Sequence, residues 1–443
     1  MTLDERLENV SVIGAAGKMG SGIAVLLAQE IAGLKLKNKD KIYRLNLIDI
    51  SEKGLDGLQN YLRSELTKTA EKGIVSLRDI YRDKKNLVEN EEIVNAFARD
   101  AFSVVRFGTD LNLAKNSKMI FEAIIEDEKL KIKVFKELKN MCSEEIFFFT
   151  NTSSVPIGFL DEKAGLSGKI IGYHFYNPPV VQRLVEVITG KTTPQELKDI
   201  ATELGKRLRK TLVSANDVAG FIGNGHFIRD GLYAIKQVKR LQKKHSFAGA
   251  VYVMNRVSQD FLIRPMGIFQ LIDYVGIDVF QCILRVMKKH LKDGSLKSEI
   301  IDVMVERKIL GGQRPDGSQK DGFLKYEKNR PVAVYSLEKG EYIPIEGKLK
   351  EDLDKKIGNL PSGFNPWKKL IAEPKKEEAL SSYFANLKTA RGLGARLARE
   401  YLLKTGEIAK KLVDDGIANS ANDVNAVLTN GFYWLYGPIN DYV

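Results

Sequence analysis

Short apolar runs alternate with longer amphipathic stretches in the N-terminal half of the chain. Residues 9–14 form a β-branched run that ends in glycine, and residues 43–50 form a second run of the kind that is buried in a sheet. Between them, small and apolar residues recur at helical spacing in residues 17–33. This pattern predicts a strand, a helix and a strand, with the basic residues 34–41 as a surface insertion.

The same alternation continues toward the middle of the chain. The expected strands are residues 119–125, 145–154, 169–175 and 183–188, and residues 127–138 form the expected helix between the first two. Pro178 and Pro179 break the chain between the last two strands, and a helix is expected to open at Thr193 and Pro194. Strands that alternate with helices indicate an α/β fold with a Rossmann-type, doubly wound, mostly parallel sheet.

Beyond about residue 216 the pattern changes to long amphipathic helices. Residues 311–375 are rich in Gly, Pro, Asp and Lys, which is typical of loops, and helical patterning returns from Ala379. We therefore expect a doubly wound domain followed by all-α C-terminal domains. The expected boundaries are 1–215 for the α/β domain, 216–330 for a first helical domain, 331–378 for a loop-rich linker and 379–443 for a second, degenerate helical domain.

Composition narrows the class of protein. With 443 residues, of which 44% are apolar, the chain can form two or three domains with real cores. We expect no membrane span, because no apolar run reaches the ~18–20 residues required, and no signal peptide, because the N-terminus is charged. Cys142 and Cys282 are too few for a disulfide scaffold or a zinc cluster, which favours a reducing, cytoplasmic location without a bound metal.

The net charge of +12 has two interpretations. It reflects either a lysine-rich solvated surface or an anionic ligand. The basic residues are spread along the chain and no recognition motif accompanies them, so nucleic acid is not an expected partner. A small molecule with several phosphates explains the charge equally well.

A glycine-rich turn, GAAGKMG at residues 14–20, follows the first predicted strand. Two residues separate its first two glycines, where the usual dinucleotide fingerprint has one. Small residues let the backbone approach a pyrophosphate, whose charge rests on the helix N-terminus. The candidate cofactor-binding residues are Gly14, Gly17, Lys18, Met19 and Gly20. The alternative is a turn that serves only tight packing of the strand against the helix.

Asp49 stands at the end of the second predicted strand, where dinucleotide sites carry an acidic residue. Its carboxylate would accept hydrogen bonds from the adenosine ribose and repel the extra phosphate of NADP, which selects NAD. Asp49 lies 29 residues after Gly20 rather than about 20, and the insertion at residues 34–41 accounts for the excess. The alternative is a structural cap of the strand.

One histidine and one glutamate stand in neighbouring strand-like runs of residues 172–190. The chain has only four histidines, and His174 lies between aromatic residues, twelve positions before Glu186. Oxidation of a secondary alcohol requires a base that takes the hydroxyl proton, and imidazole titrates near the working pH. A carboxylate beside the ring would orient it and stabilise the imidazolium. A structural role for both residues is the alternative.

Four stretches, in this order, carry a resemblance to a known family: FEAIIEDEKLKIKVFKEL, TNTSSVPI, GYHFYNPPVVQRLVEVITG and NDVAGFIGN. Over residues 8–330 the chain resembles the L-3-hydroxyacyl-CoA dehydrogenases of fatty acid β-oxidation. The resemblance implies oxidation of a 3-hydroxyacyl-CoA with NAD as cofactor. It also implies that His174 is the base and Glu186 its partner.

The resemblance assigns roles to four further residues. Ser153 matches a substrate-contacting serine, and Asn224 matches an active-site asparagine that binds the substrate oxygen. Glu126 and Lys131 match positions near the nicotinamide half of the cofactor. The alternatives are a turn or helix cap for Ser153, a helix-surface amide for Asn224 and an ordinary helix salt bridge for the other two.

The chain departs from the family pattern at three places. The glycine turn is one residue longer, Asn224 is followed by Gly225 and His226 where the family often has a large or basic residue, and Tyr176 stands where the family varies. None of these departures removes a catalytic residue type. The longer turn leaves the roles of the individual glycines open.

The C-terminal half holds a candidate repeat. Residues 264–276 resemble the helical domain of the family, and residues 431–443 resemble it again, with Gly437 parallel to Gly267. Compact members of the family dimerise through a single helical domain. Two copies in one chain predict a monomer in which the helical domains form an internal pseudo-dimer.

Two other functions stay open. One is a dehydrogenase of a free 3-hydroxy acid or a polyol on the same scaffold. The other is a non-catalytic cofactor-binding protein, against which the intact His174, Glu186, Ser153 and Asn224 argue. We expect an acyl-CoA substrate, and a separate hydratase or thiolase as a candidate partner, because no hydratase-like region is evident in the sequence.

Overall fold

The computed structural model describes residues 1–314 and 317–442, so Val443 of the expected second helical domain lies outside the described residues. The chain divides after Asp217 into two compact units. The expected boundary stood two residues earlier, at residue 215. Beyond it the chain forms one unit, whereas two helical domains and a linker were expected.

An eight-stranded sheet forms the centre of the N-terminal unit, in the order β3-β2-β1-β4-β5-β6-β7-β8. Its strands are β1 (Asn9–Ile13), β2 (Arg44–Ile48), β3 (Val105–Gly108), β4 (Met119–Glu122), β5 (Phe147–Thr150), β6 (Ile170–Phe175), β7 (Leu184–Thr189) and β8 (Thr211–Asn216). Strands β1 to β6 are parallel, β7 runs antiparallel to β6, and β8 runs parallel to β7. The predicted doubly wound, mostly parallel sheet is confirmed.

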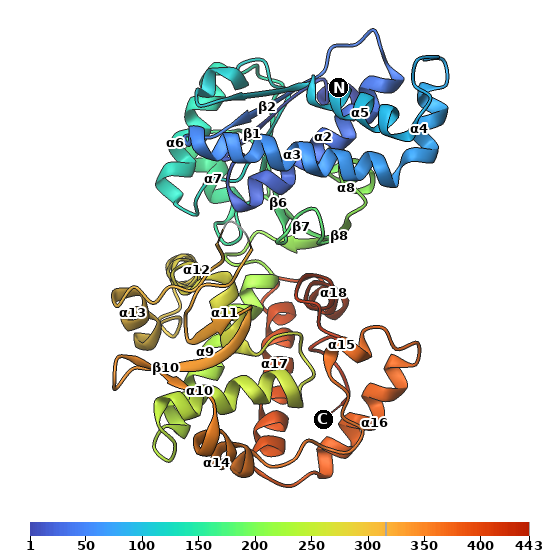
Figure 1. Ribbon diagram of the computed structural model, residues 1–443. Coiled ribbons are helices and arrows are strands. Elements are labelled where there is room, and N and C mark those ends of the chain that lie inside the picture. The colour runs from blue at the N-terminus through green and yellow to red at the C-terminus, as the bar shows by residue number, and fades with distance from the viewer. Residues whose placement is uncertain (315–316, 443) are drawn as a thin grey trace. The chain divides into compact units, whose positions relative to one another are not determined.

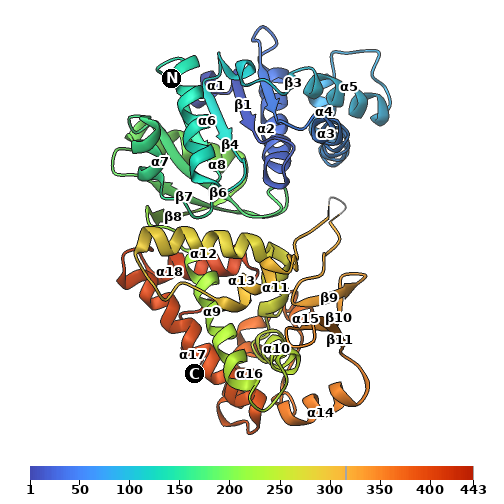
Figure 2. The same ribbon diagram turned by 90° about the vertical axis from the view of Figure 1, so that its left-hand side faces the viewer.

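Helices cover both faces of this sheet (Figures 1 and 2). They are α1 (Leu3–Arg6), α2 (Lys18–Lys37), α3 (Glu52–Lys72), α4 (Ile74–Tyr81), α5 (Asn90–Phe102), the 3₁₀ turn η1 (Leu111–Ala114), α6 (Glu128–Met141), α7 (Ile157–Ala164) and α8 (Gln195–Arg207). Phe147 and Phe149 of β5 join the core built by α2, α3, α5 and α8, whereas Phe148 packs edge-on against Phe135 of α6. This alternation follows from the period of two in a strand, which sends successive side chains to opposite faces.

The sequence pattern missed the segment between β2 and β3. Helix α3 buries Leu55, Leu58, Leu62 and Leu66, which recur at helical spacing among charged residues. The expected surface insertion at residues 34–41 is helical as far as Lys37, because α2 continues into it. The predicted helix after Pro194 is present as α8, but it begins one residue later than expected: Pro194 is its N-cap residue and Gln195 its first helical residue.

Helix α2 has the length and mean hydropathy of a membrane span, and is the one helix of the described residues that does. The expectation that no apolar run is long enough was therefore wrong for this segment. Its apolar side chains, from Ile23 to Ala32, lie in the core of the N-terminal unit. A buried core helix meets the same criterion of length and composition, so the absence of a membrane span stays a prediction.

The C-terminal unit is built mainly of helices. They are α9 (Gly223–Leu241), α10 (Phe247–Arg256), the π-helical turn η2 (Val257–Phe261), α11 (Ile268–Val275), α12 (Ile277–Leu291), α13 (Glu299–Glu306), α14 (Gly347–Ile357), α15 (Trp367–Leu370), α16 (Lys376–Thr389), α17 (Leu393–Asp414) and α18 (Ala421–Gly431). The two longest, α9 and α17, pack against each other within one hydrophobic core.

A small antiparallel sheet stands where a loop-rich linker was expected. It consists of β9 (Leu324–Glu327), β10 (Arg330–Ser336) and β11 (Glu341–Pro344), in the order β11-β10-β9. Val334 and Tyr335 of β10 are buried in the helical core. The Lys328–Asn329 pair that looked like loop is a two-residue hairpin turn with positive φ at both residues, so turn chemistry hid two short strands.

One local arrangement occurs twice in the C-terminal unit, 170 positions apart. Asn255 of α10 accepts the backbone N–H of Phe269, and Asn425 of α18 accepts that of Ile439, at 3.1 and 3.0 Å. A Cβ on Gly267 would overlap the Asn255 side chain, and a Cβ on Gly437 would overlap that of Asn425. The two copies suggested by the sequence thus share the same asparagine–glycine contact.

Candidate active site

The glycine turn joins β1 to α2. Gly14 has a φ of +79°, and a Cβ there would lie 2.7 Å from the Ala123 carbonyl oxygen, so both conformation and space require glycine. A Cβ on Gly20 would overlap the Gly14 carbonyl oxygen, so Gly20 lets α2 pack onto the turn. Gly17 is the N-cap of α2, which begins at Lys18, so the backbone N–H groups of the first turn of α2 point toward the glycine turn.

Asp49 connects the end of β2 to this turn. Its Oδ2 accepts the backbone N–H of Ala16 at 3.0 Å, and its Oδ1 accepts that of Ser51 at 3.0 Å. The carboxylate therefore has the capping role that was its structural alternative. Each carboxylate oxygen can accept a second hydrogen bond, so the same group can also bind ribose hydroxyls.

A cavity of about 450 Å³ opens beside Asp49. It lies next to β1, where the strand order reverses, because β2 lies on one side of β1 and β4 on the other. Gly14, Gly17 and Asp49 line it, whereas Lys18, Met19 and Gly20 lie in the first turn of α2 outside its lining. Ile50 and Ile125 are 95% and 71% exposed and contribute to its walls. A crevice at the carboxyl ends of parallel strands with apolar walls suits a flat ring such as adenine.

Glu126 organises the loop that follows β5. Its Oε1 accepts hydrogen bonds from the hydroxyls of Thr152 and Ser154, at 2.7 and 2.8 Å. The same oxygen accepts the backbone N–H groups of Ser153 and Ser154, at 2.9 and 3.0 Å, and the Ser153 hydroxyl at 3.3 Å. Burial alone would raise the pKa of Glu126, but Lys131 and these donors outweigh it and hold the pKa below its usual value. Glu126 therefore fixes the loop that carries Ser153.

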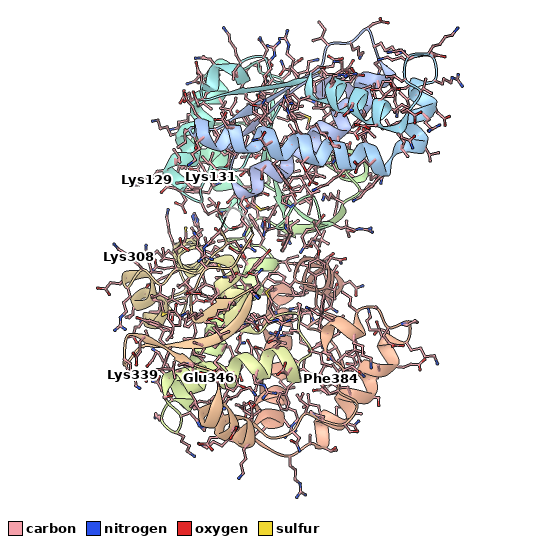
Figure 3. All side chains as sticks on the ribbon, viewed as in Figure 1. Lys129, Lys131, Lys308, Lys339, Glu346 and Phe384 are labelled. Atoms are coloured by element: carbon pink, nitrogen blue, oxygen red, sulfur yellow. The ribbon has the colours of Figure 1, made fainter. Side chains whose placement is uncertain are left out.

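Lys131 is a buried cation on α6, while its neighbour Lys129 on the same helix is exposed (Figure 3). Its Nζ lies 2.7 Å from Glu122 Oε1 and 3.3 Å from Glu126 Oε2. Burial alone would lower the pKa of Lys131, but the two carboxylates outweigh it and raise the pKa above its usual value. The ordinary helix salt bridge that was the alternative is thus a buried ion cluster.

Glu122 is the residue that sequence reasoning missed. It ends β4, is fully buried, and accepts the Thr150 hydroxyl at 2.6 Å and the Ile124 backbone N–H at 2.9 Å. An acidic residue that closes an otherwise apolar run, as in MIFE at residues 119–122, was the signal available.

His174 and Glu186 face each other across the antiparallel pair β6–β7. His174 Nδ1 lies 2.9 Å from Glu186 Oε2, with the carboxylate fully buried and the imidazole 8% exposed. A carboxylate at Nδ1 favours the tautomer with the proton on that nitrogen, so Nε2 is the nitrogen that can take a proton from a substrate. The sequence predicted these two residues as a pair, and the register of the strands places them side by side.

Tyr176, which follows β6, also reaches Glu186. Its hydroxyl donates to Glu186 Oε2 at 2.7 Å, and its ring centroid lies 4.8 Å from that of His174. Burial raises the pKa of Tyr176 well above its usual value, and the Glu186 carboxylate adds to this. Tyr176 therefore stays a neutral hydrogen-bond donor.

The loop that carries Ser153 is attached to the strand that carries His174. Asn151, which starts this loop, accepts the backbone N–H of Phe175 through its Oδ1 at 2.8 Å. The N-terminal unit therefore brings together the loop of Ser153 with Glu126, and the pair His174 and Glu186.

Asn224 belongs to the C-terminal unit, as the second residue of α9. Its place beside His174 stays a prediction. The two residues that follow it have a packing role: Gly225 lies against Leu412, and His226 Nε2 lies 3.1 Å from the Thr405 hydroxyl. Gly225 and His226, which depart from the family pattern, therefore form part of the contact between α9 and α17.

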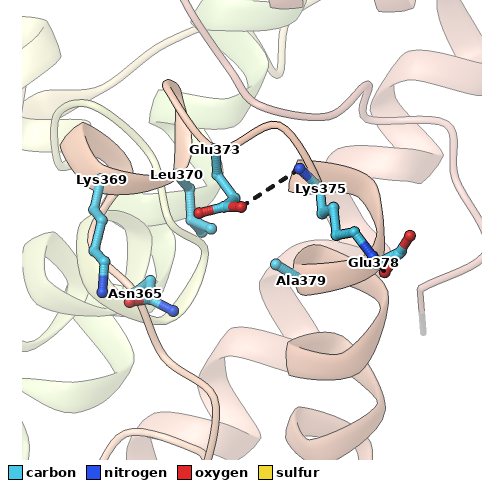
Figure 4. A pocket seen from close by; sticks show the side chains of 7 residues that line it. All are labelled: Asn365, Lys369, Leu370, Glu373, Lys375, Glu378 and Ala379. Carbon is cyan, nitrogen blue, oxygen red and sulfur yellow. Dashed lines mark hydrogen bonds and ion pairs between the residues drawn. The ribbon is translucent and has the colours of Figure 1, made fainter.

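A second cavity, of about 340 Å³, lies between α15 and α16 of the C-terminal unit (Figure 4). Its lining residues are Asn365, Lys369, Leu370, Glu373, Lys375, Glu378 and Ala379. None of the predicted site residues is among them. In the described part of the chain, no group of three or more His, Cys, Asp or Glu side chains could hold a metal ion.

A helix N-terminus over a glycine turn, an acid at the end of β2 and a histidine–carboxylate pair define a nicotinamide-dependent dehydrogenase. Comparison with known families agrees. Residues 9–218 match the NAD binding domain of 3-hydroxyacyl-CoA dehydrogenase, and residues 255–325 match the C-terminal domain of the same enzyme. The chain belongs to the 3-hydroxyacyl-CoA dehydrogenase family, and NAD is its cofactor.

Individual relatives support this assignment. A probable 3-hydroxybutyryl-CoA dehydrogenase of Deinococcus radiodurans is 31% identical over 318 residues, which are 71% of this chain and 99% of the relative. A peroxisomal fatty acid beta-oxidation multifunctional protein of rice is 28% identical over 73% of this chain and 39% of its own length. The crystal structure of 3-hydroxybutyryl-CoA dehydrogenase from Escherichia coli matches 98% of this chain and 90% of its own, with a TM-score of 0.63 and 19% identity, and so shares its fold.

Proposed function

We propose that this protein interconverts (S)-3-hydroxyacyl-CoA and 3-ketoacyl-CoA, with NAD as hydride carrier and His174 as general base. The observation that carries the proposal is the His174–Glu186 pair, 2.9 Å apart on adjacent strands, in a unit that also holds the coenzyme crevice. The names of the relatives support a CoA thioester of a 3-hydroxy acid as the substrate class and β-oxidation as its setting.

The proposed chemistry uses the side chains as the N-terminal unit arranges them. The substrate hydroxyl proton passes to His174 Nε2 while the hydrogen on the carbinol carbon leaves as hydride to NAD. Glu186 stabilises the imidazolium that results. Ser153, whose loop is fixed by Glu126, contacts the substrate.

Comparison of a thioester with the corresponding free acid tests the substrate class. We expect NADH consumption with acetoacetyl-CoA and little with free acetoacetate, measured by the loss of NADH absorbance. A higher kcat/KM for free acetoacetate would instead favour the free-acid dehydrogenase. A series of longer 3-ketoacyl-CoA substrates then gives the chain-length preference.

We further propose that the protein is a monomer in which the C-terminal copy takes the place of a partner subunit. The repeated contacts of Asn255 with Gly267 and of Asn425 with Gly437 support two copies of one element. The position equivalent to Asn224 in the second copy is Gly394, where a Cβ would overlap Phe261, so this copy provides no second asparagine. Light scattering on the full chain tests the monomer.

A cytoplasmic location and a separate hydratase or thiolase as partner also remain proposals. Neither Cys142 nor Cys282 takes part in a disulfide, which supports a reducing compartment. Cell fractionation tests the location, and co-purification from the native host tests the partner.

A further inference from the structure

We propose that Tyr176 is a positioning residue for the catalytic pair: its hydroxyl holds the Glu186 carboxylate and weakens the grip of that carboxylate on the His174 proton. The inference rests on the proposed function, because it assigns a role to Tyr176 only if His174 exchanges a proton with the substrate. The hydroxyl of Tyr176 and Nδ1 of His174 approach the same oxygen, Glu186 Oε2, at 2.7 and 2.9 Å.

The strand geometry places the two donors together. His174 pairs directly with Glu186 in the register of β6 and β7, and Tyr176, two residues further along, comes from the same side of the chain. Tyr176 is therefore a diagonal neighbour of Glu186 on the facing strand, and a long aromatic side chain can span that distance. The position of the Tyr176 ring beside the imidazole, with centroids 4.8 Å apart, matches this diagonal placement.

The segment after β6 is held on several sides, so the hydroxyl has a defined position. Lys210 Nζ donates to the Gln182 carbonyl oxygen at 2.7 Å and also to that of Pro179. A Cβ on Gly22 of α2 would lie 2.7 Å from the Pro179 ring, so the turn packs closely on that helix. Together with the bond from Phe175 to Asn151, these contacts fix Tyr176 relative to Glu186.

Because Tyr176 and His174 both donate to Oε2 of Glu186, the two hydrogen bonds compete for the negative charge of one oxygen. A carboxylate that already accepts a strong hydrogen bond attracts a second proton less. His174 of β6 and Tyr176, the residue after β6, both reach Glu186. The neighbouring residue on β8 is the apolar Val213, and the Lys210 cation donates to turn carbonyl oxygens. The Tyr176 phenol is thus a group that moderates the effect of Glu186 on the imidazole.

The hydroxyl, rather than the ring, carries the proposed role. A phenylalanine would keep the ring beside His174 and lose only the donor to Glu186. Tyr176 places a hydroxyl at a half-buried position, and this hydroxyl donates its hydrogen bond to the Glu186 carboxylate. The Tyr176→Phe substitution removes this one oxygen atom and keeps the ring. It therefore separates the effect of the hydrogen bond to Glu186 from the effect of ring packing against His174.

The test is the pH profile of kcat/KM for oxidation of 3-hydroxybutyryl-CoA with NAD, compared between the wild-type protein and Tyr176→Phe. Without the phenol, Glu186 holds the proton on His174 more tightly, so the neutral imidazole needed for oxidation appears only at higher pH. We expect the acid limb of the profile to move up by about half a pH unit, a change of about threefold in proton affinity. In the reverse direction, which needs the protonated ring, activity should extend to higher pH by the same amount.

Tyr173→Phe is the matched control. Tyr173 lies on the same strand, but its hydroxyl donates to the Ala201 carbonyl oxygen at 3.1 Å on the other face. This variant should have the wild-type profile, and NADH binding followed by fluorescence should show that both variants are folded. In a Glu186→Gln background, Tyr176→Phe should move the profile no further, because the carboxylate through which it acts is gone.

Superimposable profiles of the wild-type protein and Tyr176→Phe would overturn the inference while leaving the proposed function intact. A shift that persists in the Glu186→Gln background would also overturn it, because Tyr176 would then act by another route. A wild-type protein that binds NADH but does not oxidise the thioester would refute the proposed function itself.

Discussion

At the scale of the residue, His174 is expected to carry most of the chemical step. Glutamine in its place can keep a hydrogen bond to Glu186 but cannot take a proton. We expect His174→Gln to lower kcat by about 10²–10⁴-fold, the usual contribution of a positioned base. Steady-state kinetics with acetoacetyl-CoA and NADH measures the change.

NADH binding provides the control for this variant. The imidazole is held by Glu186, and the coenzyme crevice is lined by other residues, so the affinity for NADH should stay close to that of the wild-type protein. Near-normal turnover by His174→Gln would require another residue as the base.

Asp49 is expected to determine the choice between NAD and NADP. Its carboxylate stands at the crevice and repels a ribose phosphate, so the wild-type protein should have a much higher kcat/KM with NAD. Asp49→Ser should reduce this ratio, and should also raise the KM for NAD because the turn at Ala16 loses its acceptor. The ratio of kcat/KM for the two cofactors is the measurement.

Asp56→Ser is the matched control for Asp49→Ser, because Asp56 is an exposed residue on α3 near the same end of the sheet. It should keep the wild-type ratio. Equal kcat/KM for NAD and NADP in the wild-type protein would contradict the role assigned to Asp49.

At the scale of the element, the buried cation Lys131 joins α6 to the strand end at Glu122 and to the loop fixed by Glu126. Lys131→Met leaves two carboxylates in a site without a cation. Removal of one partner from a buried ion cluster typically costs about 3–5 kcal/mol of unfolding free energy. Urea unfolding should therefore show a large loss of stability.

Lys129→Met on the same helix is the control, because Lys129 is exposed and surface charges contribute little. Its unfolding curve should overlay that of the wild-type protein. Equal stability of the two variants would show that the buried lysine is not what holds α6 against β4.

The same cluster predicts how stability depends on pH. The pKa of Glu126 lies below 4.5 in the folded protein, because Lys131 and the donors of residues 152–154 outweigh its burial. A carboxyl group whose pKa is lower in the folded than in the unfolded protein stabilises the fold fully at a pH above its unfolded-state pKa. This stabilisation is lost as the pH falls through its folded-state pKa. The stability difference between the wild-type protein and Glu126→Gln should therefore be large at neutral pH and shrink below about pH 4.

Unfolding measured at several pH values tests this sign. The wild-type protein and Glu126→Gln should converge as the medium becomes acidic. A difference that stays constant from neutral to acidic pH would mean that the ionised form of Glu126 does not provide the stabilisation.

At the scale of the whole molecule, the segment after Lys375 covers the core of the helical unit. Thr405 of α17 donates to Asp230 at 2.9 Å, and Arg264, which pairs with Asp230 at 2.9 Å, lies 3.9 Å from the ring centroid of Trp434. Without this segment, an apolar face and a buried ion pair would meet water. A large exposed apolar patch on a protein surface drives association with another molecule.

We therefore expect the full chain to be a monomer, and a chain that ends near Lys375 to dimerise or aggregate. Light scattering on both proteins is the measurement. A soluble monomer from the shortened chain would show that the C-terminal copy does not substitute for a partner subunit.

Much of the fold could be predicted because its signals are local. Short apolar runs predicted β1, β2 and β4 to β7, and Thr193–Pro194 marked the start of α8 to within a residue. The small sheet of β9 to β11 was missed, since hairpin turns and loops share the same residue types. Its strands are defined by burial of Val334 and Tyr335 in a core that the local pattern does not show.

The sequence by itself determined the kinds of residue available: a glycine turn, one acid after the second strand, and a histidine and a glutamate in adjacent runs. These follow from spacing along the chain, which fixes what a strand end or a helix start can offer. The tertiary structure decided which groups share an atom. Tyr176 and His174 meet on one oxygen of Glu186, and Glu122 meets Lys131, because strand register and burial bring together residues that no local pattern couples.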